Sequence, residues 1–165
     1  ACRSRWRWAT IRTPSVARSP KFATSADPVP LLYADSSALV KLVRREPETN
    51  ALRADVEGTD LASSELVLTE VPRALQRIAA ADPTFLLAPA LDRAGELIDE
   101  LALYPIDRAL LLGAGALAEP SLRTLDAIHV ASAVELGSVD AFVTYDERQA
   151  AAARLAGLRT MSPGV

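Results

Sequence analysis

The sequence predicts an α/β domain with a central parallel sheet of about five short strands. Two apolar runs, residues 31–34 and 141–144, have the length and composition of buried strands, and a helical pattern follows each. Between them, short extended segments alternate with helical periodicity, as expected when helices connect the strands of a parallel sheet. At 165 residues, half of them hydrophobic, the chain is long enough to form a substantial core.

Each predicted element has its own pattern of apolar spacing and boundary residues. The predicted strands cover residues 31–34, 60–62, 103–106, 141–144 and 158–161. The predicted helices cover residues 37–45, 49–57, 66–78, 83–101, 108–117, 125–136 and 147–156. In the helix over 125–136 we expect Leu125, Ile128 and Ser132 to lie on the buried stripe. This order of elements supports a single domain over residues 31–165.

Short polar residues and glycines predict where the helices begin and end. The expected N-caps, in chain order, are Ser36 or Ser37, Ser63 or Ser64, Asp82 before Pro83, Asp107 and Thr124. The expected stops are Gly58, Gly137 and Gly157. Pro72 lies inside a helical pattern, so it should bend that helix or remove one backbone hydrogen bond.

The N-terminal 30 residues differ from the rest of the chain. They contain both tryptophans, the only cysteine and no sustained apolar periodicity. We expect an upstream extension outside the working domain. A transit peptide, or an arm in which Trp6 and Trp8 stack on RNA bases, are the alternatives.

Charge is also unevenly distributed. The formal net charge is −3, yet residues 1–30 hold six cations and one acid, which leaves 12 cations and 20 acids in residues 31–165. A body with this excess of acids does not hold nucleic acid by bulk charge. Binding to nucleic acid would therefore need local basic residues or bridging cations.

The scarcity of cysteine and histidine limits the chemistry. Cys2 is the single cysteine, which excludes a disulfide framework or a cysteine-based zinc site and fits a reducing, cytoplasmic compartment. His129 is the single histidine, and we expect it to be a packed or capping residue in preference to a catalytic base. Any bound metal would have oxygen ligands. No apolar run approaches the roughly 20 residues of a membrane helix.

Four acidic residues are predicted to gather at one edge of the sheet. Asp35 and Asp146 each follow a buried strand, and the carboxyl ends of parallel strands share one edge. The alternative for Asp35 is that it serves only as an N-cap. Asp126 lies in the first turn of its helix, and Glu70 lies beside an apolar stripe, where a lone carboxylate needs a partner or a cation. A divalent cation would relieve the repulsion, and oxygen ligands favour Mg²⁺ or Mn²⁺.

Four segments, in this order, resemble a PIN-domain ribonuclease and more narrowly a VapC-type toxin of a type II toxin–antitoxin system. They are YADSSAL at 33–39, SELVLTEV at 64–71, LRTLDAIHVA at 122–131 and FVTYD at 142–146. The resemblance covers residues 31–163 and implies a PIN-like three-layer α/β/α fold. The acidic quartet of the family falls on Asp35, Glu70, Asp126 and Asp146.

The function implied by this resemblance is that of a metal-dependent endoribonuclease. The four carboxylates would hold Mg²⁺, or Mn²⁺, for hydrolysis of RNA phosphodiester bonds, and activated water would leave 5′-phosphate and 3′-hydroxyl ends. Ser37 and Thr144 would have auxiliary roles. For Arg123 the alternatives are contact with a substrate phosphate and pairing with a carboxylate. The resemblance further implies a cognate VapB-like antitoxin that inhibits the enzyme, and a homodimer.

Other functions are weighed against this one. A catalytically inactive PIN-like module that binds RNA or a protein partner is the main alternative, although four retained acids argue against it. A haloacid-dehalogenase phosphatase requires a second aspartate where this chain has Ser37. A receiver domain requires a lysine after the last strands, and the only lysines are Lys21 and Lys41. A Ser–His–Asp hydrolase is disfavoured because no Gly-x-Ser-x-Gly motif occurs.

Overall fold

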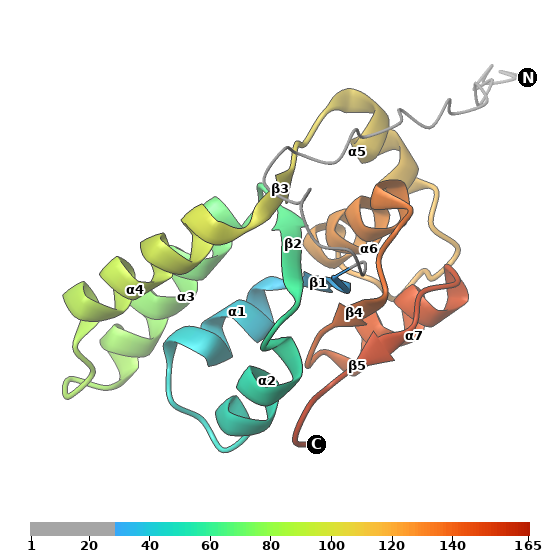
Figure 1. Cartoon of the computed structure of the whole chain (residues 1–165). Helices are drawn as coiled ribbons and strands as arrows, with labels where there is room; N and C mark the ends of the chain where they lie inside the picture. The colour runs from blue at the N-terminus through green and yellow to red at the C-terminus, as the bar shows by residue number, and fades with distance from the viewer. Residues whose placement is uncertain (1–28) are drawn as a thin grey trace, which may run out of the picture.

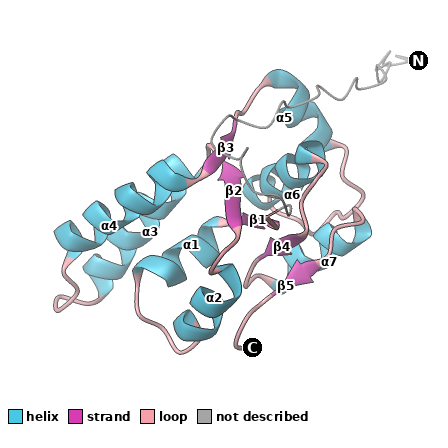
Figure 2. Ribbon diagram, in the orientation of Figure 1, coloured by secondary structure: helices cyan, strands magenta, loops and turns pink. Residues whose placement is uncertain are grey.

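A computed structural model describes residues 29–165, and its centre is a five-stranded parallel sheet with the strand order β3-β2-β1-β4-β5 (Figures 1 and 2). The strands are β1 (Leu31–Ala34), β2 (Asp60–Ser64), β3 (Ala102–Tyr104), β4 (Ala141–Val143) and β5 (Thr160–Met161). The helices are α1 (Ser36–Val43), α2 (Thr49–Val56), α3 (Val67–Ala81), α4 (Leu87–Glu100), α5 (Arg108–Gly115), α6 (Thr124–Leu136) and α7 (Glu147–Leu155). The predicted parallel sheet of five short strands is confirmed.

Helices cover both faces of this sheet. Side chains alternate along β1, so Leu32 and Ala34 join a core cluster with residues of α1 to α4, whereas Tyr33 joins a second cluster with residues of α6 and α7. Figure 1 shows the same division, with α1 to α4 on one side of the sheet and α5 to α7 on the other. The three-layer α/β/α arrangement is therefore confirmed.

The strand order places a topological switch beside β1. The chain adds β2 and β3 on one side of β1 and then crosses to the other side to add β4 and β5. Asp35, directly after β1, donates its backbone N–H to the carbonyl oxygen of Val143 at the end of β4, at 3.1 Å. In open parallel sheets, ligands bind beyond the carboxyl ends of strands at such a switch.

Two of the expected helix starts are wrong near the first strands. Asp35, and not Ser36 or Ser37, caps α1, because its side chain accepts a hydrogen bond from the Ala38 N–H. Ser63 and Ser64 extend β2 and cap no helix. Ser63 is completely buried and its hydroxyl donates to the Ala34 carbonyl at 2.6 Å, so the neighbouring strand satisfies it.

Two further starts are displaced along the chain. Asp82 ends α3, and its carboxylate accepts hydrogen bonds from the backbone and hydroxyl of Thr84, so it forms a turn and α4 begins only at Leu87. Thr124 is the first residue of α6 and not its cap, which is Arg123. The expected start is therefore displaced by one residue at α6 and by four residues at α4.

Other expectations hold or need smaller corrections. Asp107 caps α5 through the Leu110 N–H at 2.9 Å, and Gly137 ends α6 with a φ of 68°. Helix α3 continues through Pro72. Leu125 is 46% exposed, so the buried stripe of α6 does not begin there. β3 begins before its predicted range, and the last strand comprises Thr160–Met161 alone.

The predicted N-terminal extension, residues 1–30, lies almost entirely outside the described residues, as do Cys2 and both tryptophans. Within the described part of the chain, no helix combines the length and the apolar character needed to cross a bilayer.

A pair of alanine substitutions tests the caps. Asp107→Ala should lower the free energy of unfolding by about 1 kcal/mol, because the Leu110 N–H loses its acceptor. Thr124→Ala should change it by less than about 0.5 kcal/mol, because Thr124 caps nothing. Urea denaturation measures both. A larger loss for Thr124→Ala than for Asp107→Ala would contradict the assignment.

Candidate active site

Asp35 lies at the end of the central strand and is held from three sides. It is 3% exposed, and its Oδ1 accepts hydrogen bonds from the Ser37 hydroxyl at 2.7 Å and the Ala38 N–H at 2.9 Å. Its Oδ2 lies 2.7 Å from the Thr144 hydroxyl. Burial raises the pKa of Asp35, against the lowering effects of the nearby His129 and of these hydrogen bonds.

Thr144 connects Asp35 to Asp146 after β4. The Thr144 hydroxyl is fully buried, lies 2.7 Å from both Asp35 Oδ2 and Gln149 Oε1, and accepts the Asp146 N–H at 3.1 Å. With one proton, it donates to one of these two acceptors at a time. Asp146 caps α7 and pairs with Arg148 at 3.2 Å; burial acts to raise its pKa, but the hydrogen bonds from Arg148 and Gln149 outweigh this and lower it. Thr144 is therefore positioned to orient Asp35 and is closed to direct contact with a substrate.

Asp126 differs from the other acids because its charge has no structural partner. It is half-buried in the first turn of α6, and its carboxylate makes no hydrogen bond or ion pair with any residue in 29–165. Burial raises the pKa of Asp126, and the charges of Asp146, Asp35 and Glu70 raise it further, against a lowering effect of Arg123. This coupling brings all four predicted acids into one electrostatic neighbourhood, which we call the acidic site.

Glu70 approaches the acidic site from α3 and is bound by a histidine. Its Oε2 lies 2.7 Å from Nε2 of His129, whose Nδ1 lies 2.8 Å from the Tyr33 hydroxyl. Burial acts to raise the pKa of Glu70, but the hydrogen bond and charge of His129 outweigh it and lower the pKa. His129 is 1% exposed and packed, as expected, but its bond to Glu70 is a contact that we did not predict.

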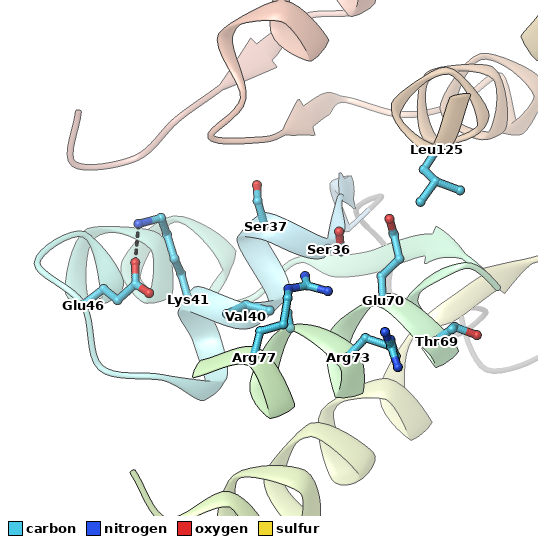
Figure 3. Close-up of a pocket in the computed structure, with 11 residues that line it drawn as sticks. Ser36, Ser37, Val40, Lys41, Glu46, Thr69, Glu70, Arg73, Arg77 and Leu125 are labelled. Carbon is cyan, nitrogen blue, oxygen red and sulfur yellow. Dashed lines mark hydrogen bonds and ion pairs between the residues drawn. The ribbon is translucent and has the colours of Figure 1, made fainter. Parts of the chain in front are cut away.

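A groove between α1 and α3 opens beside Glu70. Its volume is about 540 Å³. It is lined by Ser36, Ser37, Val40 and Lys41 of α1, by Thr69, Glu70, Arg73, Ala74 and Arg77 of α3, and by Glu46 and Leu125 (Figure 3). We call it the α1–α3 groove. It shares Glu70 with the acidic site, and Ser37 at its wall is the hydroxyl bound to Asp35.

The three predicted auxiliary residues act in two ways: Ser37 and Thr144 through hydrogen bonds, and Arg123 through its charge. Ser37 donates to Asp35 and accepts the Tyr145 N–H at 3.1 Å, so it supports the first acid from the side of α1. Arg123 is exposed at the start of α6, and its charge acts on Asp126 without a bonded contact. Of the three predicted auxiliary residues, Ser37 and Thr144 contact Asp35 and Arg123 does not.

The carboxylate oxygens of the acidic site are suitable ligands for a hard cation, but in this structure they lie farther apart than the ligands of a bound metal ion. Within residues 29–165, no three acidic, histidine or cysteine side chains lie close enough together to hold a metal ion. Hydrogen bonds hold Asp35, Glu70 and Asp146 to other partners. Carboxylate oxygens are the ligands that Mg²⁺ and Mn²⁺ prefer. The pKa of Asp126 is raised chiefly by burial and further by the negative charges of Asp146, Asp35 and Glu70.

Residues missed at the sequence level are those whose partners lie far along the chain. Arg73 and Arg77 follow Glu70 on α3 at helical spacing, and His129 follows Asp126 by three residues on α6. That spacing could have indicated a shared face. Nothing in the sequence could have shown which partners that face would meet.

Solved structures with related folds support the architecture. One is PAE2754 from Pyrobaculum aerophilum, with a TM-score of 0.58 and 20% identity, covering 80% of this chain and 83% of that chain. Another is VapBC2 from Rickettsia felis bound to a DNA fragment from its promoter, with a TM-score of 0.58 and 13% identity over 79% of this chain and 97% of that chain. At these identities the likeness concerns the fold.

Sequence comparison gives a closer relationship. The PIN domain model matches residues 32–155. Ribonuclease VapC47 of Mycobacterium tuberculosis is 36% identical over 140 residues, covering 81% of this chain and 98% of the relative. Ribonuclease VapC46 of the same organism is 40% identical over 135 residues, covering 80% and 97%. The chain therefore belongs to the PIN-domain family and, within it, to the VapC-type branch.

Proposed function

We propose that this protein is an endoribonuclease toxin that hydrolyses RNA phosphodiester bonds at the acidic site with the help of Mg²⁺ or Mn²⁺. The observation that best supports the proposal is that the charges of Asp35, Glu70 and Asp146 act on Asp126, although the four acids come from separate parts of the fold. Relatives that share 36–40% identity with the chain are named ribonucleases. Asp126, whose carboxylate has no partner within the described residues and which lies near the charges of the other three acids, suits a function in which a cation is bound.

When bound, the metal would lower the pKa of a water molecule and neutralise phosphate oxygens. The roles of the chain follow from its own contacts. Asp35 is kept in one orientation by Ser37, the Ala38 N–H and Thr144, so it offers a fixed carboxylate. Asp126 has no other partner and is the carboxylate most available to a cation. A fixed carboxylate beside an available one gives a defined place for the scissile phosphate.

RNA as substrate is supported by the cations of the α1–α3 groove. Arg73 and Arg77 are exposed one turn apart on α3, and neither has an ion-pair partner within residues 29–165. Lys41, the third cation of the groove, is held by Glu46 and Glu48. Residues 31–165 carry 20 acids against 12 cations, so these two arginines are the local positive charge that a phosphate chain requires next to Glu70.

A protein partner completes the proposal. We expect a VapB-like antitoxin to inhibit the enzyme by placing an arginine or lysine against the acidic site, where uncompensated negative charge favours a cation. The structural neighbour from Rickettsia felis is a VapBC assembly, which supports a partner of this type. We also expect a homodimer; its support is the exposed Leu111 and Leu112 on α5.

Asp126→Asn tests the proposed chemistry with little risk to the fold, because the Asp126 side chain makes no structural hydrogen bond within the described residues. Cleavage of total RNA in Mg²⁺ or Mn²⁺ should fall at least about 100-fold. Replacing a residue that only supports a metal ligand already lowers metal affinity or activity by about 10- to 100-fold. The parent should be inactive in EDTA and should leave 5′-phosphate and 3′-hydroxyl ends.

The matched control is Asp99→Asn, an exposed acid on α4. It should cleave RNA at the rate of the parent. Full activity in a folded Asp126→Asn protein would remove the proposed mechanism. A parent that binds RNA or a partner but never cleaves would favour the inactive PIN-like module instead.

The groove arginines give a second prediction. In the Asp126→Asn background and without metal, Arg73→Gln combined with Arg77→Gln should weaken binding of single-stranded RNA. The slope of log affinity against log salt concentration should fall by about 0.7 for each arginine that contacts a phosphate. Fluorescence anisotropy at several salt concentrations measures this slope.

Arg93→Gln combined with Arg108→Gln removes the same charge from α4 and α5 and serves as the control. It should leave both affinity and slope close to those of the parent background. Equal losses in the two double variants would show that only bulk charge matters and that the α1–α3 groove has no special role.

A further inference from the structure

Three residues from three layers of the fold form a buried hydrogen-bonded chain that ends at the acidic site. Tyr33 of β1 is completely buried, stacked on Phe142 at 5.1 Å and edge-on to the His129 ring at 5.9 Å. Its hydroxyl lies 2.8 Å from His129 Nδ1, and His129 Nε2 lies 2.7 Å from Glu70 Oε2. The chain thus runs from the central strand through α6 to α3.

The chemistry of the three groups determines which of them donates each hydrogen bond. An ionised carboxylate can only accept hydrogen bonds, so in the 2.7 Å contact Nε2 of His129 is the donor to Glu70. Burial raises the pKa of the Tyr33 hydroxyl, which therefore keeps its proton and can donate it to Nδ1. Tyr33 thereby selects the His129 tautomer that donates to Glu70.

We propose that His129 is a positioning residue for Glu70. His129 holds Glu70 through Oε2, and the carboxylate lies on the wall of the α1–α3 groove, where the Ser36 side chain also acts on it. This inference rests on the proposed function.

Helix α6 connects two of the four acids. Asp126 and His129 lie three residues apart on it and therefore share one face. The helix holds Asp126 directly and Glu70 through His129, so one rigid element sets the separation of two acids that come from different helices. The residues around His129 on α6, Ile128, Val130 and Ala131, are apolar and buried, so packing alone would be satisfied by an apolar side chain here.

Two substitutions at the same position separate positioning from packing. The amide of His129→Gln reaches about as far as Nε2 and can still donate to Glu70, whereas His129→Asn reaches only about as far as Nδ1 and keeps the partner of Tyr33. Both leave an amide in the core, so their losses in melting temperature should be similar. Mn²⁺ affinity, measured by calorimetry, should fall about 10-fold in His129→Asn and remain within about threefold of the parent in His129→Gln.

A double-variant cycle assigns the effect to Glu70. In a Glu70→Gln background, His129→Asn should cause no further loss of Mn²⁺ affinity, because the group through which it acts has already changed. Should His129→Asn fail to fold, Tyr33→Phe replaces it. We then expect a several-fold loss of Mn²⁺ affinity in the protein that retains Glu70 and no loss in the Glu70→Gln background.

The outcomes distinguish this inference from the proposed function. A parent that neither binds Mn²⁺ nor cleaves RNA overturns the proposed function and this inference with it. A parent that binds Mn²⁺ while the His129→Asn protein binds it equally well overturns this inference alone. The same holds if the loss persists undiminished in the Glu70→Gln background, or if the Gln and Asn variants lose affinity equally.

Discussion

Electrostatic repulsion among carboxylates at the switch beside β1 is the constraint on which the rest of the site depends. Parallel order brings the ends of β1 and β4 together, so Asp35 and Asp146 share one edge, and α6 and α3 add Asp126 and Glu70. Hydrogen bonds surround Asp35, His129 holds Glu70, and Arg148 with the start of α7 holds Asp146. Asp126 alone has none of these devices, and its pKa is raised by burial and by its three neighbours. The negative charge left over is what a cation would neutralise.

Asp35 and Asp146 combine a structural role with the functional role that we propose for them. Asp35 caps α1 and Asp146 caps α7, and a side-chain N-cap typically contributes about 1 kcal/mol to stability. The same hydrogen bonds that satisfy the helix ends also fix the carboxylates at the sheet edge. A choice between "cap" and "site" for Asp35 therefore does not arise, because the geometry of the cap is what directs the carboxylate. Asp126 lacks such a structural role, which makes it the most informative of the four to replace.

The sequence predicts the sheet, the helix order and the gathering of the acids, because these depend on periodicity and on the common direction of parallel strands. Prediction from the sequence fails where contacts between residues distant in the sequence determine the local structure. Ser63 and Ser64 are residue types typical of a helix cap, but they pair with Leu103 and Tyr104 of β3 and therefore belong to β2. Asp82 has the signal of a helix start, yet it forms a turn with Thr84. The bond between Glu70 and His129 joins residues 59 positions apart, and no local pattern indicates it. The α1–α3 groove depends in the same way on how two helices pack.

The most direct test of the central claim compares the stability of the parent and Asp126→Asn with and without Mn²⁺. If the four acids repel one another, removing the charge of Asp126 should raise the metal-free free energy of unfolding by about 1 kcal/mol. Mn²⁺ should then raise the melting temperature of the parent through binding linkage, and raise that of Asp126→Asn much less. A destabilised Asp126→Asn protein, together with no effect of Mn²⁺ on either melting temperature, would contradict the account and identify the acids as ordinary caps and ion-pair partners.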